Sequence, residues 1–468
     1  MKRLIFCFDG TWNRLDAPYP TNVVLMAQSI LPTAIDRLTK EPTVQNIYYD
    51  QGVGTAQGTK WAGGVFGEGL LDNIVTAYSF LIFNYQIGDE IYIFGFSRGA
   101  FTARSFAGFL RTVGILRRCD AGKIAHSVEA YKHRSPEEKP DAESFLRYRA
   151  AASPDICCDI NEDIWRQKNV LGYRAGASPI LRIRYLGVWD TVGELGVPND
   201  LLIAPFINKQ YMFHETGLDN MVVAARHAVA IDEPRKSFAP ALWDNVGALN
   251  TELGFSSDVS DAPYQQMWFP GVHGSVGGGG DVRGLSDFAL QWVVDGAREV
   301  GLALDTTRTS QIYTLNPDPC SALSNVSKPD TGLSGFAMHL MPTAPRMPGP
   351  SNLWELSDST IKRWAAPEAA LPEKVLYRPK TLDNVAEALK AVAAKTAKPQ
   401  SSPIAVQVSQ PAPGSHYKVV WGDTLSAIAQ KAYGAASHAE LIFEANRGLL
   451  SSPDHIYIGQ ILFIPPDS

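Results

Sequence analysis

The sequence predicts an α/β fold in which a mainly parallel sheet carries helices on both faces. Three observations lead to this fold class: short apolar runs rich in β-branched and aromatic residues, apolar residues at helical spacing between those runs, and glycine-containing turns directly after several of them. Strands that alternate with helices form parallel sheets, which are buried on both faces. A chain of 468 residues exceeds one ordinary core, so we expect at least two domains.

The expected strands are continuous apolar runs, and the expected helices lie between them. Residues 117–180 are more polar and contain no clear strand, so they predict a helical insertion beside the sheet and a candidate lid. The expected strands are residues 3–9, 46–50, 90–96, 182–190 and 267–273, and the expected helices are 66–85, 100–116 and 285–302.

The C-terminal part of the chain changes in composition. Residues 391–415 are rich in proline, serine and alanine, which indicates a semi-extended linker between a first domain (residues 1–390) and a small independent domain (residues 416–468).

Composition and charge limit the classes of partner. Charged residues make up 19 % of the chain and the net charge is −6, which indicates a globular protein and gives no support to a nucleic-acid partner. The five cysteines have no metal-ligand spacing, so we expect no metal, no cofactor and folding in a reducing compartment.

The N-terminal stretch "MKRLIFCFDGTWN" has five clearly apolar residues before Asp9, too few for the core of a signal peptide. No stretch approaches the roughly 18–20 apolar residues of a membrane helix. We therefore expect a cytoplasmic protein in the producing cell.

A lone serine lies between glycines where a predicted strand becomes a predicted helix. In Gly95-Phe96-Ser97-Arg98-Gly99 the strand delivers Ser97 to the edge of the sheet, and the glycines permit a tight turn. Such a turn exposes the hydroxyl beside the N-terminus of a helix, as in a nucleophile elbow. The alternative is a plain turn with a serine N-cap.

A serine nucleophile needs a base and an orienting acid. Asp190 ends the predicted strand 182–190 and is the favoured acid, with Asp232 and Asp281 as rivals. His273 opens the glycine-rich stretch "HGSVGGGGDVRG", which we expect to be a flexible loop that can bring the imidazole over the sheet edge. His227 is the second candidate, in a neighbourhood that reads as helical.

The reaction also needs two donors for an oxyanion. We expect one from the backbone N–H of Arg98 and the other from Gly10 or Thr11, which follow the first strand. The Asp9 side chain is expected to fix this loop through hydrogen bonds.

Several stretches together resemble the uncharacterised α/β-hydrolase family that includes type VI secretion phospholipase effectors. They are "FCFDGTWN", "PTNV", "YYDQGVGT", "GFSRGAFTAR", "GVWDTVG", "FPGVHGSVGGG" and "LSDFALQW", and the resemblance covers about residues 1–305. It implies an α/β-hydrolase-like fold and a Ser-Asp-His triad at Ser97, Asp190 and His273. Family members often have His-Ser-Asp-Val where this chain has His273-Gly274-Ser275-Val276.

The tail is similar to a LysM module over residues 416–465, a small βααβ domain that recognises glycans containing N-acetylglucosamine. "YKVVWGDTLSAIA" predicts a strand, a turn and a helix with Thr424 near its cap, and "QILFIP" predicts the returning strand. The resemblance implies sugar-binding loops at 422–426 and 453–457, with the candidate residues Gly422, Asp423, Thr424, Leu425, Ser426, Asp454, His455 and Ile456.

These features favour a serine carboxylester hydrolase, lipase- or phospholipase-like, that LysM holds at the cell wall. The implied partners are a lipid or other acyl-ester substrate, peptidoglycan, a transient membrane surface, and a secretion machine of type VI kind that delivers the protein to a target cell envelope. The alternatives are a non-catalytic peptidoglycan-binding protein with a hydrolase-like scaffold, and an esterase for a polyester or an acylated glycan.

Overall fold

Contacts divide the chain into two compact units. The first comprises Met1–Asp244 and Gln265–Leu389, and the second comprises Asn245–Tyr264 and Lys390–Ser468. The computed structural model describes residues 1–10, 15–35, 41–52, 65–132, 134, 139–193, 217–255, 262–305, 307, 310, 314–328, 342–396, 411–419, 423–446, 456 and 461–466.

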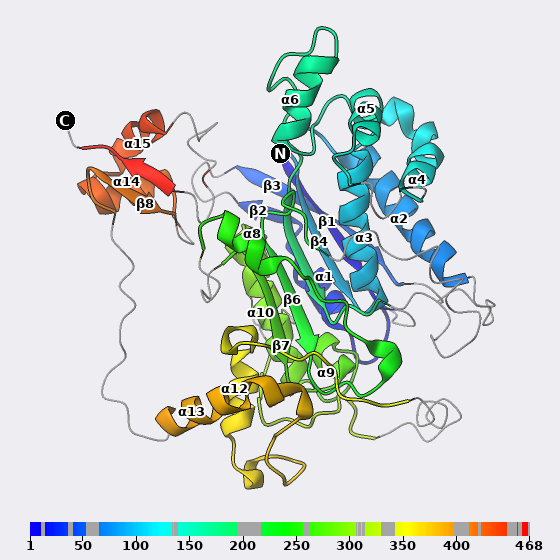
Figure 1. Ribbon diagram of the computed structural model, residues 1–468, viewed down its shortest axis with the longest axis vertical. Coiled ribbons are helices and arrows are strands. Elements are labelled where there is room, and N and C mark those ends of the chain that lie inside the picture. The colour runs from blue at the N-terminus through cyan, green and yellow to red at the C-terminus, as the bar shows by residue number, and fades with distance from the viewer. Residues whose placement is uncertain are drawn as a thin grey trace. The chain divides into compact units, whose positions relative to one another are not determined.

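The first unit is built on a twisted sheet with the strand order β2-β3-β1-β4-β5-β6-β7 among the described residues (Figure 1). Neighbouring strands from β3 to β6 pair in parallel, whereas β2 pairs antiparallel with β3. The strands are β1 (Lys2–Phe8), β2 (Thr33–Ile35), β3 (Pro42–Asp50), β4 (Glu90–Phe96), β5 (Ile183–Trp189), β6 (Ala225–Ala230) and β7 (Tyr264–Phe269).

Helices cover both faces of the sheet, as Figure 1 shows, with α2 and α3 on one face and α1 and α10 on the other. The alternation of side chains along β1 explains this: Phe6 contacts Phe80 and Phe106 on one face, while Ile5 and Cys7 join the core on the other. The α-helices described in this unit are α1 (Asn22–Ser29), α2 (Val65–Asn84), α3 (Arg98–Val113), α4 (Ile124–Lys132), α5 (Glu143–Ala152), α6 (Ile160–Asn169), α9 (His273–Gly277), α10 (Gly284–Glu299) and α12 (Asp358–Ala365); α13 (Ala386–Thr396) starts in it.

The predicted α/β class is confirmed, and the five predicted strands correspond to β1, β3, β4, β5 and β7. The strand β6 was not predicted. Its sequence "ARHAVA" carries Arg226 and His227, which made this stretch read as helical, yet all six residues are buried in a strand.

The insertion at 117–180 is helical in its described residues, with α4, α5 and α6. It packs at the far end of α3, where Arg149 of α5 donates to the carbonyls of Arg111 and Thr112. Arg111 and Thr112 follow Ser97 by 14 and 15 residues, so at about 1.5 Å per residue this contact lies roughly 22 Å from the turn at Ser97. The role of the insertion as a lid stays a prediction.

The chain after 341 returns to the sheet and completes its core. Trp364, Leu371 and Leu382 form a buried cluster with Trp268 of β7 and Ile231, just after β6. The segment 342–389 is therefore an integral part of the first unit rather than a tail.

The second unit contains α8 (Val246–Glu252) and the C-terminal module. The module has the predicted βααβ order: β8 (Ser415–Lys418), α14 (Leu425–Tyr433), α15 (Ala439–Ala445) and β9 (Ile461–Ile464), with β8 and β9 antiparallel. Of the predicted linker 391–415, residues 391–396 continue helix α13 and 397–410 lie outside the described residues. Among the described helices of the whole chain, none combines the length and apolarity needed to cross a bilayer.

Candidate active site

Ser97 occupies a strained turn between β4 and α3. Its backbone φ is 58°, a left-handed value that costs a non-glycine residue about 1–3 kcal/mol when the surroundings enforce it. The flanking glycines are needed for close approach: a Cβ at Gly95 would lie 2.5 Å from the Gly99 carbonyl oxygen, and one at Gly99 would collide with the carbonyl of Phe8 at the end of β1. The turn therefore presents Ser97 at the carboxyl edge of the sheet.

A chain of hydrogen bonds joins Ser97, His273 and Asp190. The Ser97 Oγ lies 2.8 Å from His273 Nε2, and His273 Nδ1 lies 2.5 Å from Asp190 Oδ2. All three residues are buried. The structure thus brings together three side chains that the sequence places on three separate strand ends.

The Asp190 carboxylate is surrounded by donors. It accepts hydrogen bonds from the backbone N–H of Ala230 (2.8 Å) and from both terminal nitrogens of Arg346 (2.5 and 2.9 Å). Burial would raise the pKa of Asp190, but the Arg346 guanidinium and the His273 imidazole hold it well below its usual range. Asp190 is therefore ionised at neutral pH, so it accepts a hydrogen bond from the Nδ1–H of His273 and leaves Nε2 as the acceptor for the Ser97 hydroxyl.

His273 is the first residue of the short helix α9, which corrects the expectation of a flexible loop. Its backbone N–H donates to Glu233 Oε2 over 3.1 Å. Its ring lies against Phe96 (centroids 4.7 Å apart) and meets the edge of Phe238 (4.9 Å). These contacts fix the ring plane as well as the backbone.

Asp232, a rival acid in the sequence, supports the turn before His273 instead. Its Oδ2 accepts from the Gly271 N–H (2.7 Å) and from the Tyr377 hydroxyl (2.7 Å). Although part of the residue is exposed, burial of the carboxylate raises the pKa of Asp232 to about 6. Asp281, the other rival, accepts from the backbone N–H and the hydroxyl of Ser327.

Replacing Asp232 with asparagine is expected to change how stability depends on pH. An aspartate with a raised folded-state pKa loses its contribution to stability as pH rises from its unfolded-state pKa of about 4 to its folded-state pKa of about 6. Asparagine keeps an oxygen for Gly271 and Tyr377 but does not titrate. The melting temperature of Asp232→Asn minus that of the wild type should therefore increase across this window, and a difference that is constant with pH would contradict the assignment.

The predicted oxyanion donors have different settings. Arg98 begins α3, in the first turn of a helix, where backbone N–H groups have no acceptor within the helix itself. The Gly10 N–H donates to Asp9 Oδ1 (2.7 Å), so in this conformation it is directed at Asp9. Thr11 lies outside the described residues.

Asp9 holds the loop after β1, as expected. Its other oxygen accepts from the hydroxyls of Thr21 (2.7 Å) and Tyr49 (2.8 Å), and the residue is buried. The carboxylate therefore links three separate segments beside the Ser97 turn.

His227, the second histidine candidate, lies in β6 and serves the loop after Asp190. Its Nε2 accepts from the Thr191 N–H (3.2 Å), and its Nδ1 lies 2.9 Å from the side-chain oxygen of Gln266. Burial, together with Arg104, lowers the pKa of His227 to about 3, so this histidine is neutral.

In the LysM module, some of the predicted sugar-binding residues have buried side chains and others are partly exposed. The side chain of Asp423 is buried and accepts from Tyr417 and Lys431, and Leu425 is in the core, so a sugar contact at these two positions would use the backbone. Thr424 caps α14 by accepting from the Ala427 N–H (3.0 Å), as predicted. Ser426 and Ile456 are partly exposed, while Gly422, Asp454 and His455 lie outside the described residues.

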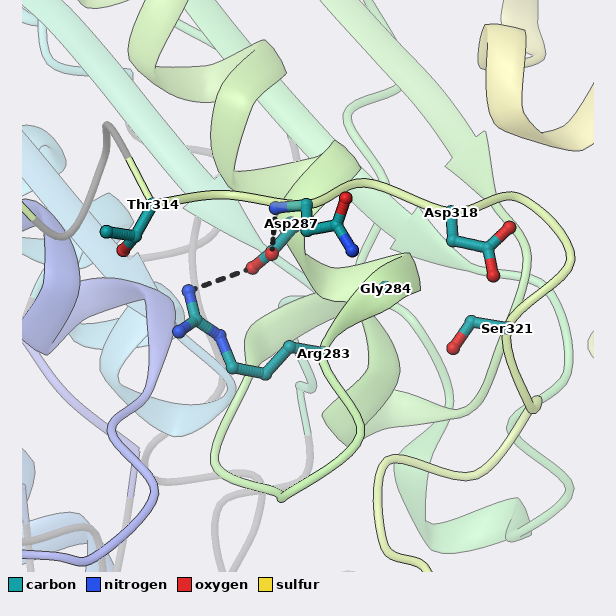
Figure 2. A pocket seen from close by; sticks show the side chains of 7 residues that line it. Arg283, Gly284, Asp287, Thr314, Asp318 and Ser321 are labelled. Carbon is teal, nitrogen blue, oxygen red and sulfur yellow. Dashed lines mark hydrogen bonds and ion pairs between the residues drawn. The ribbon is translucent and has the colours of Figure 1, made fainter. Parts of the chain in front are cut away.

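A separate cavity of about 310 Å³ lies at the N-terminus of α10 and is lined by Arg283, Asp287 and Asp318, among others. Figure 2 shows that Arg283 reaches back to Asp287, 3.0 Å away, and Asp287 also accepts from the Asn316 N–H. The principal charges of this cavity are paired within the protein, and no residue of the Ser97 site lines it.

Comparisons with known proteins agree with both halves of the sequence analysis. Residues 2–296 match the family described as "T6SS, Phospholipase effector Tle1-like, catalytic domain", and residues 417–465 match the LysM domain. An uncharacterized protein of Saccharomyces cerevisiae is 26 % identical over 252 residues, covering 51 % of this chain and 32 % of that protein. The potassium binding protein Kbp of Escherichia coli O6:H1 is 51 % identical over 63 residues, covering 13 % of this chain and 42 % of Kbp.

The chain therefore spans about a third of the yeast relative and less than half of Kbp. Two solved structures are also similar. A Tle1 effector bound to the VgrG spike of the type 6 secretion system has a TM-score of 0.37 and 14 % identity, covering 68 % of this chain and 77 % of that chain. An uncharacterized protein from Pseudomonas aeruginosa has a TM-score of 0.35 and 17 % identity, covering 86 % and 60 %.

The resemblance that the sequence motifs indicated is thereby confirmed, for the catalytic part and for the LysM tail. The catalytic-domain match begins at residue 2, contains every residue of the Ser97–His273–Asp190 chain and extends over more than half of the sequence. This chain belongs to the Tle1-like family of type VI secretion phospholipase effectors.

Proposed function

We propose that this protein is a serine carboxylester hydrolase that cleaves acyl esters of phospholipids, with Ser97 as nucleophile, His273 as general base and acid, and Asp190 as the residue that orients His273. The observation that carries the proposal is the hydrogen-bond chain from Ser97 through His273 to Asp190, at 2.8 and 2.5 Å. Membership of the phospholipase effector family supports the choice of substrate class.

In the first step, Ser97 Oγ attacks the acyl carbonyl carbon while its proton passes to His273 Nε2. The carbonyl π bond opens, and its electron pair moves to the oxygen. Asp190, ionised beside Nδ1, stabilises the imidazolium that forms. The strained φ of Ser97 favours this step, because the turn already holds Oγ against the imidazole before substrate arrives.

The oxyanion of the tetrahedral intermediate needs preorganised donors. The Arg98 N–H directly follows the nucleophile and is the first proposed donor; the loop after β1, at Gly10 and Thr11, is the proposed source of the second. Because Gly10 donates to Asp9, the Thr11 N–H is the favoured member of that pair. Each donor in such a site contributes about 2.7–4 kcal/mol to the transition state.

Collapse of the intermediate breaks the ester C–O bond, and His273 Nε2 returns its proton to the departing alcohol, which is a lysophospholipid. Water then attacks the acyl-enzyme with His273 as base, and the fatty acid leaves as Ser97 regains its proton. No oxidant, metal or cofactor enters this balance.

The LysM module is proposed to hold the enzyme at peptidoglycan, which raises its local concentration near envelope membranes. Delivery by a type VI secretion machine is proposed from the family membership. The module is also similar to part of a potassium binding protein, so potassium is a variable to control in binding measurements.

The test is product analysis combined with active-site labelling. The full chain is incubated with vesicles of phosphatidylethanolamine and phosphatidylglycerol, and we expect fatty acid and lysophospholipid in equal amounts. Prior treatment with a fluorophosphonate should abolish both products and leave the label on the peptide that contains Ser97. In a second arm, the full chain should sediment with purified peptidoglycan sacculi in potassium and in sodium buffer, and soluble N-acetylglucosamine oligomers should release it.

Vesicles of ether-linked phospholipids, which lack acyl esters, are the matched control and should yield no fatty acid. Release of a free headgroup, a label on another residue, or hydrolysis that survives labelling would each overturn the proposed reaction. Failure to sediment would overturn the targeting role alone.

A further inference from the structure

Arg346 makes a two-pronged ion pair with the carboxylate of Asp190. Its Nη1 lies 2.5 Å from Oδ1 and its Nη2 lies 2.9 Å from Oδ2, and the arginine is only 4 % exposed. The fork of a guanidinium matches the two oxygens of a carboxylate, so this pairing fixes the carboxylate plane as well as its charge.

The same guanidinium also ties Asp190 to neighbouring elements. Nη1 donates to the Ala230 carbonyl at the end of β6 (2.9 Å), and Nη2 donates to the Phe238 carbonyl (2.6 Å). The ring of Phe238 is one of the two that enclose the His273 imidazole. Arg346 thus contacts the surroundings of both the acid and the base of the site.

The backbone that carries Arg346 is anchored independently. The Ala344 N–H donates to the Pro234 carbonyl (2.8 Å), and the Lys236 N–H donates to the Pro342 carbonyl (3.0 Å). These bonds form a short antiparallel bridge at Arg235 and Thr343. The arginine therefore reaches Asp190 from a fixed position and can impose a geometry on it.

Among the described residues, Asp190 and Glu233 make hydrogen bonds with His273, and each of them is paired with an arginine. Asp190 faces Nδ1, Glu233 accepts from the backbone N–H of His273, and Arg235 pairs with Glu233 at 2.5 Å while lying over the ring of Phe238. The positive charge of Arg235 offsets the negative charge of Glu233. The charge that acts on the imidazole through Nδ1 is therefore that of Asp190, offset by Arg346. A cation on Asp190 weakens the attraction of that carboxylate for a protonated imidazole.

We propose that Arg346 is a positioning residue of this site: it orients the Asp190 carboxylate and, as a cation bonded to it, weakens the attraction of that carboxylate for a positively charged imidazole. The residue lies outside the part of the chain that matches the catalytic-domain family, residues 2–296, so the family match does not assign it a role. The proposal deepens the proposed serine hydrolase function and rests on it.

The test is the rate at which a fluorophosphonate labels Ser97 in the full chain, measured from pH 5 to pH 9. In Arg346→Gln the charge and the fork are both lost, so the pH of half-maximal labelling should rise by about one unit and the plateau rate should fall at least ~10-fold. In Arg346→Lys the charge stays, so the half-maximal pH should remain within about 0.3 units of the wild type while the plateau rate falls.

Arg226→Gln is the matched control, since Arg226 is also buried and paired, with Glu299 at 2.6 Å, but lies away from the site. It should lower the melting temperature and leave the half-maximal pH unchanged. An Arg346→Gln protein with the half-maximal pH of the wild type would overturn the proposal. If Arg346→Gln does not fold, the Arg346→Lys protein is the test instead. A plateau labelling rate of Arg346→Lys equal to that of the wild type would overturn the proposal. A wild-type protein that takes no label at all overturns the hydrolase function itself.

Discussion

Ser97→Ala is expected to lower the kcat for hydrolysis of phospholipid esters by about 10⁶-fold, because alanine has no hydroxyl with which to form the covalent intermediate. The remaining rate would come from binding and from the oxyanion donors alone. The variant should keep the fold of the wild type, since alanine meets the same backbone strain at φ 58° that serine does. Release of fatty acid from vesicles and the far-UV circular dichroism spectrum are the two measurements.

Two further variants sharpen this result. Ser79→Ala makes the same chemical change in α2, where the hydroxyl only donates to the Val75 carbonyl, and should keep the wild-type rate. Ser97→Gly should be as inactive as Ser97→Ala but more stable by about 1 kcal/mol, because glycine tolerates a positive φ. Ester hydrolysis by Ser97→Ala at a rate near the wild type would remove Ser97 from the mechanism.

Gly99→Ala is expected to destabilise the protein by at least ~3 kcal/mol, a large part of the stability of an ordinary domain. The added methyl would collide with the carbonyl oxygens of Phe8 and Asp9, and neither can move without disturbing β1. Since Asp9 also holds the loop proposed to supply an oxyanion donor, activity should fall along with stability. Urea-induced unfolding measures the first effect, and fluorophosphonate labelling of the folded fraction measures the second.

Gly122→Ala is the control for this substitution. A Cβ at Gly122 meets nothing within 4 Å, so the change in stability should stay within about 1 kcal/mol. Equal stability of the Gly99→Ala and Gly122→Ala proteins would show that the approach of α3 to β1 is looser than the structure has it.

The strands that can be predicted from the sequence are those whose own residues carry the whole pattern. β1, β4 and β5 are apolar along their whole length, because both faces of a parallel sheet are covered, and this pattern is visible in the sequence. β6 was missed because its two polar residues are buried with distant partners: Arg226 with Glu299, and His227 with Gln266. A linear pattern contains no information on such partners.

The three principal site residues could be located for a topological reason. Parallel strands end at the same edge of the sheet, so a serine after β4, an aspartate after β5 and a histidine after β7 are brought together by the fold itself. Arg346 has no comparable signal, because it follows a stretch without regular pattern and its role depends on a contact with Asp190 far earlier in the chain.

The glycine at residue 274 also has a local explanation that the sequence alone does not provide. A Cβ at Gly274 would collide with the side-chain amide of Asn325. The backbone carbonyl of Asn325 accepts a hydrogen bond from the Val282 N–H, which holds the segment around Asn325 beside the residues that follow α9. A side chain at this position would therefore require Asn325 to move.

The ion pair between Arg346 and Asp190 has a consequence for biosynthesis. A ribosome makes the chain from the N-terminus, so Ser97, Asp190 and His273 all emerge well before Arg346 does. A nascent chain with the first three residues already exposed still lacks the cation that fixes its aspartate. If lipid hydrolysis depends on that cation, the nascent chain stays inactive until the ribosome has also made Arg346, which follows His273 by 73 residues.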